Sequence, residues 1–364
     1  MDTVQKLFRF LDESPTCYHA AANAKAALTA AGAVELRESE QWKLEKGTLY
    51  VVERGDSALV AFRVPEGPFH GFLMAAAHSD SPTFKIKENA EMKVEEKYIR
   101  LNTEKYGGMI LSTWLDRALS VAGRVVVREG RELVTKLVNV DKDLLVIPNV
   151  AIHMNREMNQ GVAYNPQCDM LPLFADCSEG KKKNAFMKRI AKAAGVKAED
   201  ILSHDLFLYP REKGRVLGEN GEFLLSPRLD DLQCVFAESR AFCESRPEEY
   251  INVCAVFDNE EVGSGTKQGA DSTFLEDTLY RIAEGLGLEK GDYLRMIAES
   301  FLISADNAHA VHPNHPEKAD PTNRPYVNGG IVIKFHGSQK YATDAVSAAK
   351  LKGLCEEAHV PYQT

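Results

Sequence analysis

Apolar side chains recur along the chain with two different periods, which predict helices and strands. Residues 2–12 and 17–31 repeat apolar positions at helical spacing, so we expect two helices near the start of the chain. Two shorter apolar runs, residues 49–52 and 58–64, flank a polar stretch centred on Gly55, and this pattern is typical of a β-hairpin. The sequence therefore opens with two helices and a hairpin.

The middle of the chain has a different pattern from its two ends. Three segments alternate apolar and charged positions with the period of strands: residues 93–101, 124–128 and 133–138. A polar helix is expected at 184–194, and strand and helix signals alternate again from residue 228 onward, as a mostly parallel sheet requires. We therefore expect an α/β fold in which helices cover a central mixed, largely parallel sheet. Residues 1–90 and 226–364 would form this domain, and residues 91–225 would form a β-rich insert.

Four short apolar runs each end in acidic or histidine residues. They are residues 72–77 before His78 and Asp80, 224–229 before Asp230 and Asp231, 253–257 before Glu260 and Glu261, and 301–304 before Asp306 and His309. Each run has the character of an interior strand, and open α/β sheets place their sites at the carboxyl ends of such strands. A single histidine or aspartate there is more often a structural residue or a helix cap. Four such ends together indicate a functional site.

The adjacent carboxylates Glu260 and Glu261 can divide the work of a metal-dependent hydrolase. One carboxylate can bind a cation, which leaves its neighbour free to take a proton from water. Histidine and carboxylate ligands without a thiolate suit catalytic zinc, and carboxylate-rich sites also accept cobalt or manganese. The alternative interpretation is an acidic turn that only faces solvent.

Composition and charge argue against some other classes of protein. The chain has 364 residues and a formal net charge of −9, which argues against nucleic acid as its main partner. It contains no apolar run of about eighteen residues, so we expect no membrane-spanning helix. The start of the chain lacks the pattern of a signal peptide, and its seven cysteines form no Cys-x-x-Cys pair, so we expect reduced thiols in the cytoplasm. The basic residues 181–183 are interpreted as a solvated face.

Five motifs occur in an order that points to one known family: AAAHSDSP, LSPRLDD, FDNEEVGS, SADNAHAVHPNH and GGIVIKF. With these motifs the chain resembles, from its first helix to its last residue, the aspartyl aminopeptidases, which belong to a clan of co-catalytic zinc aminopeptidases. The resemblance implies two zinc ions, with cobalt or manganese as substitutes. It assigns the ligands by motif: His78 binds one zinc, Asp230 bridges both, and Glu261 and Asp306 bind them terminally. It also makes Glu260 the general base and Asp80 the acceptor that orients the His78 ring.

The resemblance also implies a reaction. Members remove one N-terminal residue, in this case Asp or Glu, from peptide substrates. A lysine at the end of an interior strand is unusual, and Lys334, in the strand expected at 331–335, would select acidic side chains. His309 could hydrogen-bond the substrate or only stabilise its own loop.

An assembly is implied as well. In the family the insert is the dimer contact, and dimers assemble into a homo-oligomer of twelve subunits. His153, inside the insert, matches a histidine that reaches across an interface into the neighbour's active site. From the residues alone, His153 could also be a structural histidine on an apolar strand.

One part of the resemblance fails near the end of the chain. Family members continue past the equivalent of residues 360–364 and supply a final histidine ligand, whereas His359, beside a helix expected at 345–358, lacks the matching motif. We therefore expect a second metal site that is open and weak, and an impaired peptidase activity. Two other functions stay open: a broader glutamyl or deblocking aminopeptidase, and an inactive truncated paralogue with a structural role in an assembly.

Overall fold

The computed structural model of the chain describes residues 2–177 and 184–364 and divides into two compact units. The first unit contains Met1–Arg215 and Leu225–Ala305, and the second contains Val216–Leu224 and Asp306–Thr364. The basic residues 181–183, interpreted above as a solvated face, lie outside the described residues. No helix in the described ranges is both long and apolar enough to span a bilayer.

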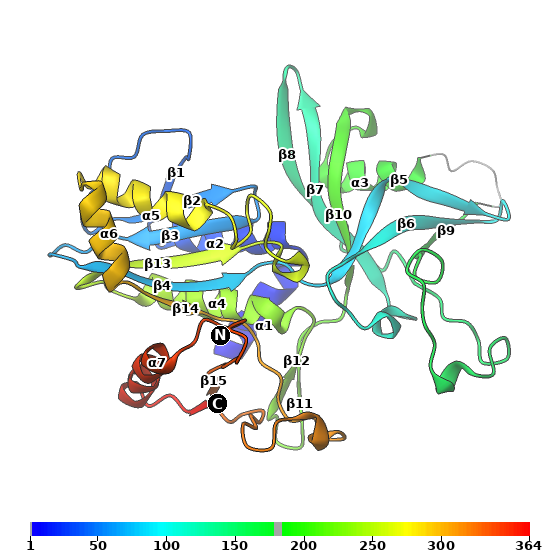
Figure 1. Ribbon diagram of the computed structural model, residues 1–364. Helices are drawn as coiled ribbons and strands as arrows, with labels where there is room; N and C mark the ends of the chain where they lie inside the picture. The colour runs from blue at the N-terminus through cyan, green and yellow to red at the C-terminus, as the bar shows by residue number, and fades with distance from the viewer. Residues whose placement is uncertain (1, 178–183) are drawn as a thin grey trace. The chain divides into compact units, whose positions relative to one another are not determined.

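The first unit contains a six-stranded mixed sheet, here called the central sheet (Figure 1). Its strands run in the order β1 (Val34–Leu36), β2 (Leu49–Arg54), β3 (Ala58–Arg63), β13 (Tyr250–Phe257), β4 (Gly71–His78) and β14 (Phe301–Ser304). The pairs β1–β2, β4–β13 and β4–β14 are parallel, whereas β2–β3 and β3–β13 are antiparallel. The expectations of a mixed, largely parallel sheet and of a hairpin near its start are therefore confirmed.

Helices cover both faces of the central sheet. Successive side chains of a strand point to opposite faces, so apolar residues on both faces need a covering layer. Two groups of helices provide this layer: α5 (Phe274–Gly285) and α6 (Lys290–Glu299) on one face, and α1 (Thr3–Glu13), α2 (Cys17–Ala30) and α4 (Leu229–Glu244) on the other. In β3, Val60 and Phe62 pack in the first core, and Leu59 and Ala61 pack in the second. Figure 1 shows α5 and α6 on one side of the sheet and α4 on the other. Burial on both faces explains the continuous apolar runs, and the two N-terminal helices are confirmed.

The first unit also contains a six-stranded sheet in which every pair is antiparallel, here called the antiparallel sheet. Its strands run in the order β8 (Glu132–Asn139), β7 (Leu119–Glu129), β10 (Ile201–Pro210), β5 (Thr83–Val94), β6 (Tyr98–Tyr106) and β9 (Leu173–Asp176). Phe186 and Ile190 of α3 (Ala185–Ala194) pack in its core with Phe84 and Leu101. The strands expected at 124–128 and 133–138 and the helix expected near 184 are therefore confirmed.

The single strand expected at 93–101 is wrong, because the chain reverses direction within it. β5 ends at Val94 and β6 begins at Tyr98. Between them Glu95 and Glu96 have φ angles of +48° and +51°, in the left-handed region that ends a strand. Glutamate is not a typical turn residue, so the alternation of apolar and charged positions continues through the turn without a signal.

The interior strand expected at 224–229 is also wrong. β12 (Phe223–Leu225) is short and exposed, and among the described strands it pairs only with β11 (Arg215–Leu217). Pro227 has no backbone N–H for a sheet, and Arg228 has a φ of +60°, so the strand cannot continue. The aspartates that follow therefore lie at the start of a helix and not at a strand end.

The second unit is small and is drawn from orange to red in Figure 1, apart from residues 216–224. It contains β15 (Ile331–Val332) in parallel with β16 (Tyr362–Gln363), and α7 (Ala345–Glu357), whose N-terminus Asp344 caps. The strand expected at 331–335 is thus only two residues long, since its partner strand offers only two residues. Short 3₁₀ helices occur between the longer elements: η1 (Leu111–Trp114), η2 (Met158–Gln160), η3 (Ala198–Asp200), η4 (Glu260–Val262) and η5 (Pro316–Lys318).

Candidate metal centre

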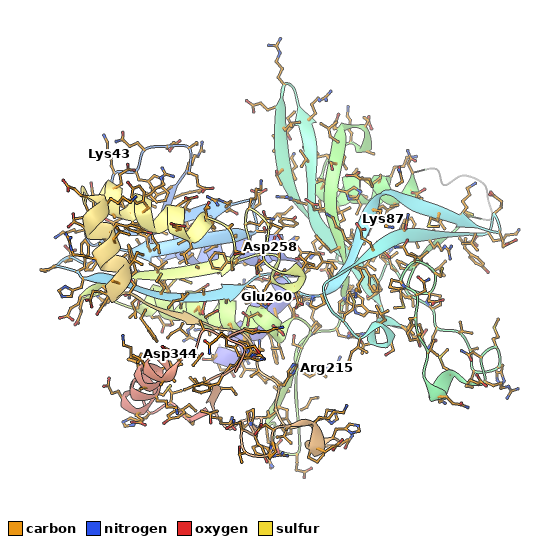
Figure 2. The ribbon with its side chains drawn as sticks, viewed as in Figure 1. Lys43, Lys87, Arg215, Asp258, Glu260 and Asp344 are labelled. Carbon is orange, nitrogen blue, oxygen red and sulfur yellow. The ribbon has the colours of Figure 1, made fainter. Side chains whose placement is uncertain are left out.

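Three neighbouring strands of the central sheet end at the same edge. β4 lies between β13 and β14, and its last residue, His78, pairs with Phe257 at the end of β13. The chain then passes through Asp258 into η4, which carries Glu260 (Figure 2). On the other side Ser304 of β14 pairs with Ala76 of β4, and Asp306 follows two residues later in the chain. The expected strand ends are confirmed for these three strands.

The start of α4 brings two aspartates to the end of β4. Asp231 is buried, and its Oδ2 accepts a hydrogen bond of 3.2 Å from the backbone N–H of His78. Ser81 Oγ donates to the backbone oxygen of Asp230 at 3.1 Å, and the Asp230–Asp231 peptide bond is cis. The two hydrogen bonds hold the start of α4 beside His78, where Asp230 and Asp231 have non-helical backbone angles. The anchoring role of Asp231 was not predicted, although the Asp-Asp doublet was visible in the sequence.

The two ring nitrogens of His78 have different surroundings. Nδ1 lies 3.1 Å from the backbone oxygen of Asp80 and 3.3 Å from its Oδ1. Nε2 lies 3.4 Å from Oδ1 of Asp230 and 4.0 Å from Oε2 of Glu260. Because acceptors of Asp80 hold Nδ1, Nε2 is the nitrogen that faces the other carboxylates and the one that can bind a metal.

The charges at this edge suit a bound cation. Burial lowers the pKa of His78, but the hydrogen bonds with Asp230 and Asp80 outweigh this effect and raise the pKa to about 11. Burial, together with the neighbouring carboxylates, raises the pKa of Glu261 to about 7, although His78 opposes this shift. One imidazole nitrogen among several carboxylates is a donor set that zinc accepts. The residues present therefore fit a zinc site.

The carboxylate of Asp80 connects His78, Tyr106 and the two glutamates through hydrogen bonds. Its carboxylate accepts backbone hydrogen bonds from Glu260 at 3.1 Å and from Glu261 at 3.2 Å. Tyr106, at the end of β6, donates to its Oδ2 at 2.6 Å. Burial would raise the pKa of Asp80, but the hydrogen bonds from His78 and Tyr106 hold it below its usual value. Tyr106 was not predicted, because no local motif reveals a contact from a distant strand of the antiparallel sheet.

Three of the predicted site residues belong to the second unit. Lys334 Nζ lies 3.3 Å from Oδ2 of Asp306 and donates to the backbone oxygen of Asn307 at 2.8 Å. Lys334 lies two residues after the end of β15, and His309 is exposed. Lys334 therefore holds the segment that carries Asp306.

His153 is set apart from these residues in the sequence and in its surroundings. It lies in an exposed turn between β8 and β9, and not on an apolar strand. Its neighbours Ile152 and Met154 are exposed as well. Within the first unit, the structure therefore brings together His78, Asp80, Asp230, Glu260 and Glu261, and it places His153 on an open loop.

Known proteins with a similar sequence or fold point to one class of enzyme. Residues 10–364 match the family model described as "Aminopeptidase I zinc metalloprotease (M18)". A Clostridium acetobutylicum protein named "Probable M18 family aminopeptidase 2" is 48% identical over 368 residues, which cover 100% of this chain and 85% of that protein. The cryo-EM structure of the Ape4 and Nbr1 complex has a TM-score of 0.95 and 35% identity, over 99% of this chain and 74% of that one. The structure of the S. cerevisiae mApe1 dodecamer has a TM-score of 0.87 and 26% identity, over 100% of this chain and 84% of that one.

Proposed function

Since this chain belongs to the M18 family of zinc metalloproteases, which are aminopeptidases, we propose that it removes single Asp or Glu residues from the N-termini of peptides. The observation that carries the proposal is the cluster around His78, in which Nε2 faces Asp230 and Glu260 while Asp80 holds Nδ1. Such a cluster is suited to hold a metal ion next to a free carboxylate.

The metal ligands of this proposal come from four places in the chain. His78 Nε2 and the carboxylates of Asp230, Glu261 and Asp306 would hold two zinc ions, with Asp230 as a ligand common to both and the second ion held weakly. The first three are carried by the end of β4, the start of α4 and η4. Asp306 follows the end of β14, the strand next to β4, and this position in the chain supports its inclusion.

Glu260 is the proposed general base. Bound zinc would lower the pKa of water and polarise the scissile carbonyl group. Glu260 takes a proton from the attacking water and passes it to the nitrogen of the leaving peptide. Its side chain is 50% exposed, so substrate and water can reach it, whereas the backbone N–H of Glu260 is held by Asp80.

Lys334 is the proposed source of acidic specificity. Its side chain is 21% exposed, and its ammonium group already lies beside the carboxylate of Asp306. A partly buried cation that can pair with a carboxylate would favour a substrate whose first side chain is acidic. The competing interpretation is that Lys334 only positions Asp306, and a comparison of substrates separates the two.

The proposed assembly is a homo-oligomer of dimers, with twelve subunits as in the S. cerevisiae mApe1 structure. We assign the dimer contact to the insert, residues 91–225, and the catalytic domain to residues 1–90 and 226–364. The separate core of the antiparallel sheet supports this division. Met154 is 82% exposed next to His153, and an apolar side chain of this kind is suited to an interface. His153 would then reach the neighbouring active site.

A cytoplasmic location completes the proposal. All seven cysteines are free thiols in the described chain, and a reducing compartment keeps thiols in this state.

One experiment tests the proposed function directly. The purified protein is incubated with peptides that begin with Asp, Glu, Leu or Ala, and the released amino acid is measured with the zinc content of the same sample. We expect zinc-dependent release that is fastest for Asp and Glu, and its loss after chelation. Equal release of all four residues would replace the acidic preference with the broader specificity of a deblocking aminopeptidase. Zinc-free protein with no release would overturn the enzymatic proposal.

A further inference from the structure

Tyr106 is the last residue of β6 in the antiparallel sheet, and its hydroxyl group reaches the candidate metal centre. The hydroxyl donates to Oδ2 of Asp80 at 2.6 Å and accepts a hydrogen bond of 2.8 Å from Nδ2 of Asn259. Asp80 is 2% exposed, so this contact lies away from bulk water. A short bond from a hydroxyl to a buried carboxylate is among the stronger hydrogen bonds in proteins.

The backbone next to Tyr106 also approaches the site closely. Gly107 has a φ of +77°, and a Cβ atom at this position would lie only 2.9 Å from Cβ of Glu261. The end of β6 therefore packs directly against η4, which carries both glutamates. A side chain at Gly107 would strain the backbone and displace Glu261.

The ring of Tyr106 is held by the antiparallel sheet. It packs edge-on against Phe207 of β10 with ring centroids 5.7 Å apart, and Phe207 in turn contacts Tyr18 with centroids 6.4 Å apart. The hydroxyl group therefore has a fixed position, and Asp80 is oriented against a rigid donor.

We infer that Tyr106 is a positioning residue of the metal centre, which acts through Asp80 on His78 and on both glutamates. Oδ2 of Asp80 accepts from Tyr106 and from the backbone N–H of Glu261, whereas its Oδ1 faces Nδ1 of His78 and accepts from the backbone N–H of Glu260. The antiparallel sheet thus contributes to metal binding within its own subunit. The inference rests on the proposed ligand roles of His78 and Glu261.

The main alternative is that Tyr106 only stabilises the fold through its ring. Phenylalanine keeps the ring and its contact with Phe207 and removes only the oxygen, so Tyr106→Phe separates the two roles. A matched control is Tyr209→Phe in the same sheet, because Tyr209 also donates one hydrogen bond, to Oδ1 of Asn139 at 2.7 Å. Any general effect of losing a tyrosine hydroxyl group should appear in both variants.

The test measures the affinity of the metal-free variants for zinc by competition with a chromogenic chelator. We expect Tyr106→Phe to weaken zinc binding about tenfold, the lower end of the range for groups that orient a metal ligand. Tyr209→Phe should bind zinc as the unaltered protein does. With cobalt in place of zinc, Tyr106→Phe should also shift the visible absorption of the bound ion. Unchanged affinity and an unchanged cobalt spectrum in Tyr106→Phe would overturn the inference.

A double-mutant cycle tests whether the effect passes through Asp80. In an Asp80→Asn background, Tyr106→Phe should have little further effect on zinc affinity. An equal loss in both backgrounds would show that Tyr106 acts on the fold and would overturn the inference. His78→Ala distinguishes this failure from a failure of the proposed function. If His78→Ala leaves zinc affinity unchanged, the ligand assignment itself is wrong. If His78→Ala abolishes binding while Tyr106→Phe leaves the affinity unchanged, only the role of Tyr106 is wrong.

Discussion

Oε2 of Glu260 lies 4.0 Å from Nε2 of His78, on the opposite side of the ring from Asp80. The two side chains therefore face the same small volume, in which a metal ion and a water molecule are proposed to bind. Glu260 enters this volume from a half-exposed position, whereas His78 is buried. The difference separates a base that must exchange protons with substrate from a ligand that must stay fixed.

The first prediction concerns the roles of the two glutamates. Glu260→Gln should keep its zinc and lose a factor of about 10² or more in kcat/KM, because only the proton acceptor is removed. Glu261→Gln is the matched control and should lose zinc, because it changes a proposed ligand. Zinc content by elemental analysis and kcat/KM should be measured on the same samples. A similar loss of zinc in both variants would contradict the assignment.

The second prediction concerns the choice of substrate. Lys334→Met should raise the barrier for Asp and Glu substrates by roughly 2–5 kcal/mol, the range for breaking a desolvated charge pair. The barrier for Leu substrates should change little. Lys352→Met is the control: it removes the same positive charge from α7 of the same unit. If kcat/KM falls equally for Asp and Leu substrates, Lys334 acts through Asp306 and not on the substrate.

The third prediction concerns the assembly and His153. Light scattering should find an oligomer, and His153→Ala should lower kcat/KM without dissociating it. If His153 acts on a neighbouring active site, mixing His153→Ala with Glu260→Gln should restore part of the activity. The restored sites would take Glu260 from one subunit and His153 from the other. A monomer with full activity, or a mixture no more active than its components, would argue against the role of His153.

The fourth prediction concerns a buried acid in α4. Both carboxylate oxygens of Glu238 are buried without a hydrogen-bond partner in the described part of the chain. Burial, with a smaller effect of the negative charge of Asp231, raises the pKa of Glu238 from its usual 4.5 to about 9. The folded protein therefore binds this proton more tightly than the unfolded chain does. The stabilisation is fully present below the usual pKa and is lost as the pH rises towards 9, by about 1.4 kcal/mol per pH unit at most.

Glu238→Gln removes this titration and should leave a free energy of unfolding that depends less on pH. Urea denaturation at several pH values between the usual and the raised pKa should show the variant gaining stability relative to the unaltered protein as the pH rises. Glu244→Gln, on the exposed end of the same helix, should show no such trend. Parallel stability curves for Glu238→Gln and the unaltered protein would mean that Glu238 is ionised in the folded state.

The central sheet could be predicted because its strands are buried on both faces. Strands such as β13 then appear as continuous apolar runs, and the acidic residues that follow mark the edge of the sheet. The same rule does not predict how Asp230 reaches His78, because Asp230 does not follow an interior strand. The left-handed backbone of Arg228 places it at a helix start, which the apolar pattern does not reveal.

Contacts between distant segments were the part that the sequence pattern could not show. Tyr106 reaches Asp80 only because β5 and β6 pair and return the chain to the end of β4. The turn at Glu95 that makes this pairing was itself missed, because it contains none of the usual turn residues. The periodicity of apolar residues indicates which face of a segment is buried. It does not indicate which other segment packs against that face.

The parallel pairing of β4 with β13 has a consequence for the folding of the chain during its synthesis on the ribosome. β4 is made early, but its partner is made only after the whole antiparallel sheet has been synthesised. The antiparallel sheet is built from strands that lie between them in the chain and can fold first, since closing shorter loops costs less entropy. His78 is therefore synthesised well before Glu260 and Glu261. A nascent chain that has not yet reached the end of β13 therefore lacks the proposed general base, and the proposed peptidase activity requires synthesis to pass this strand.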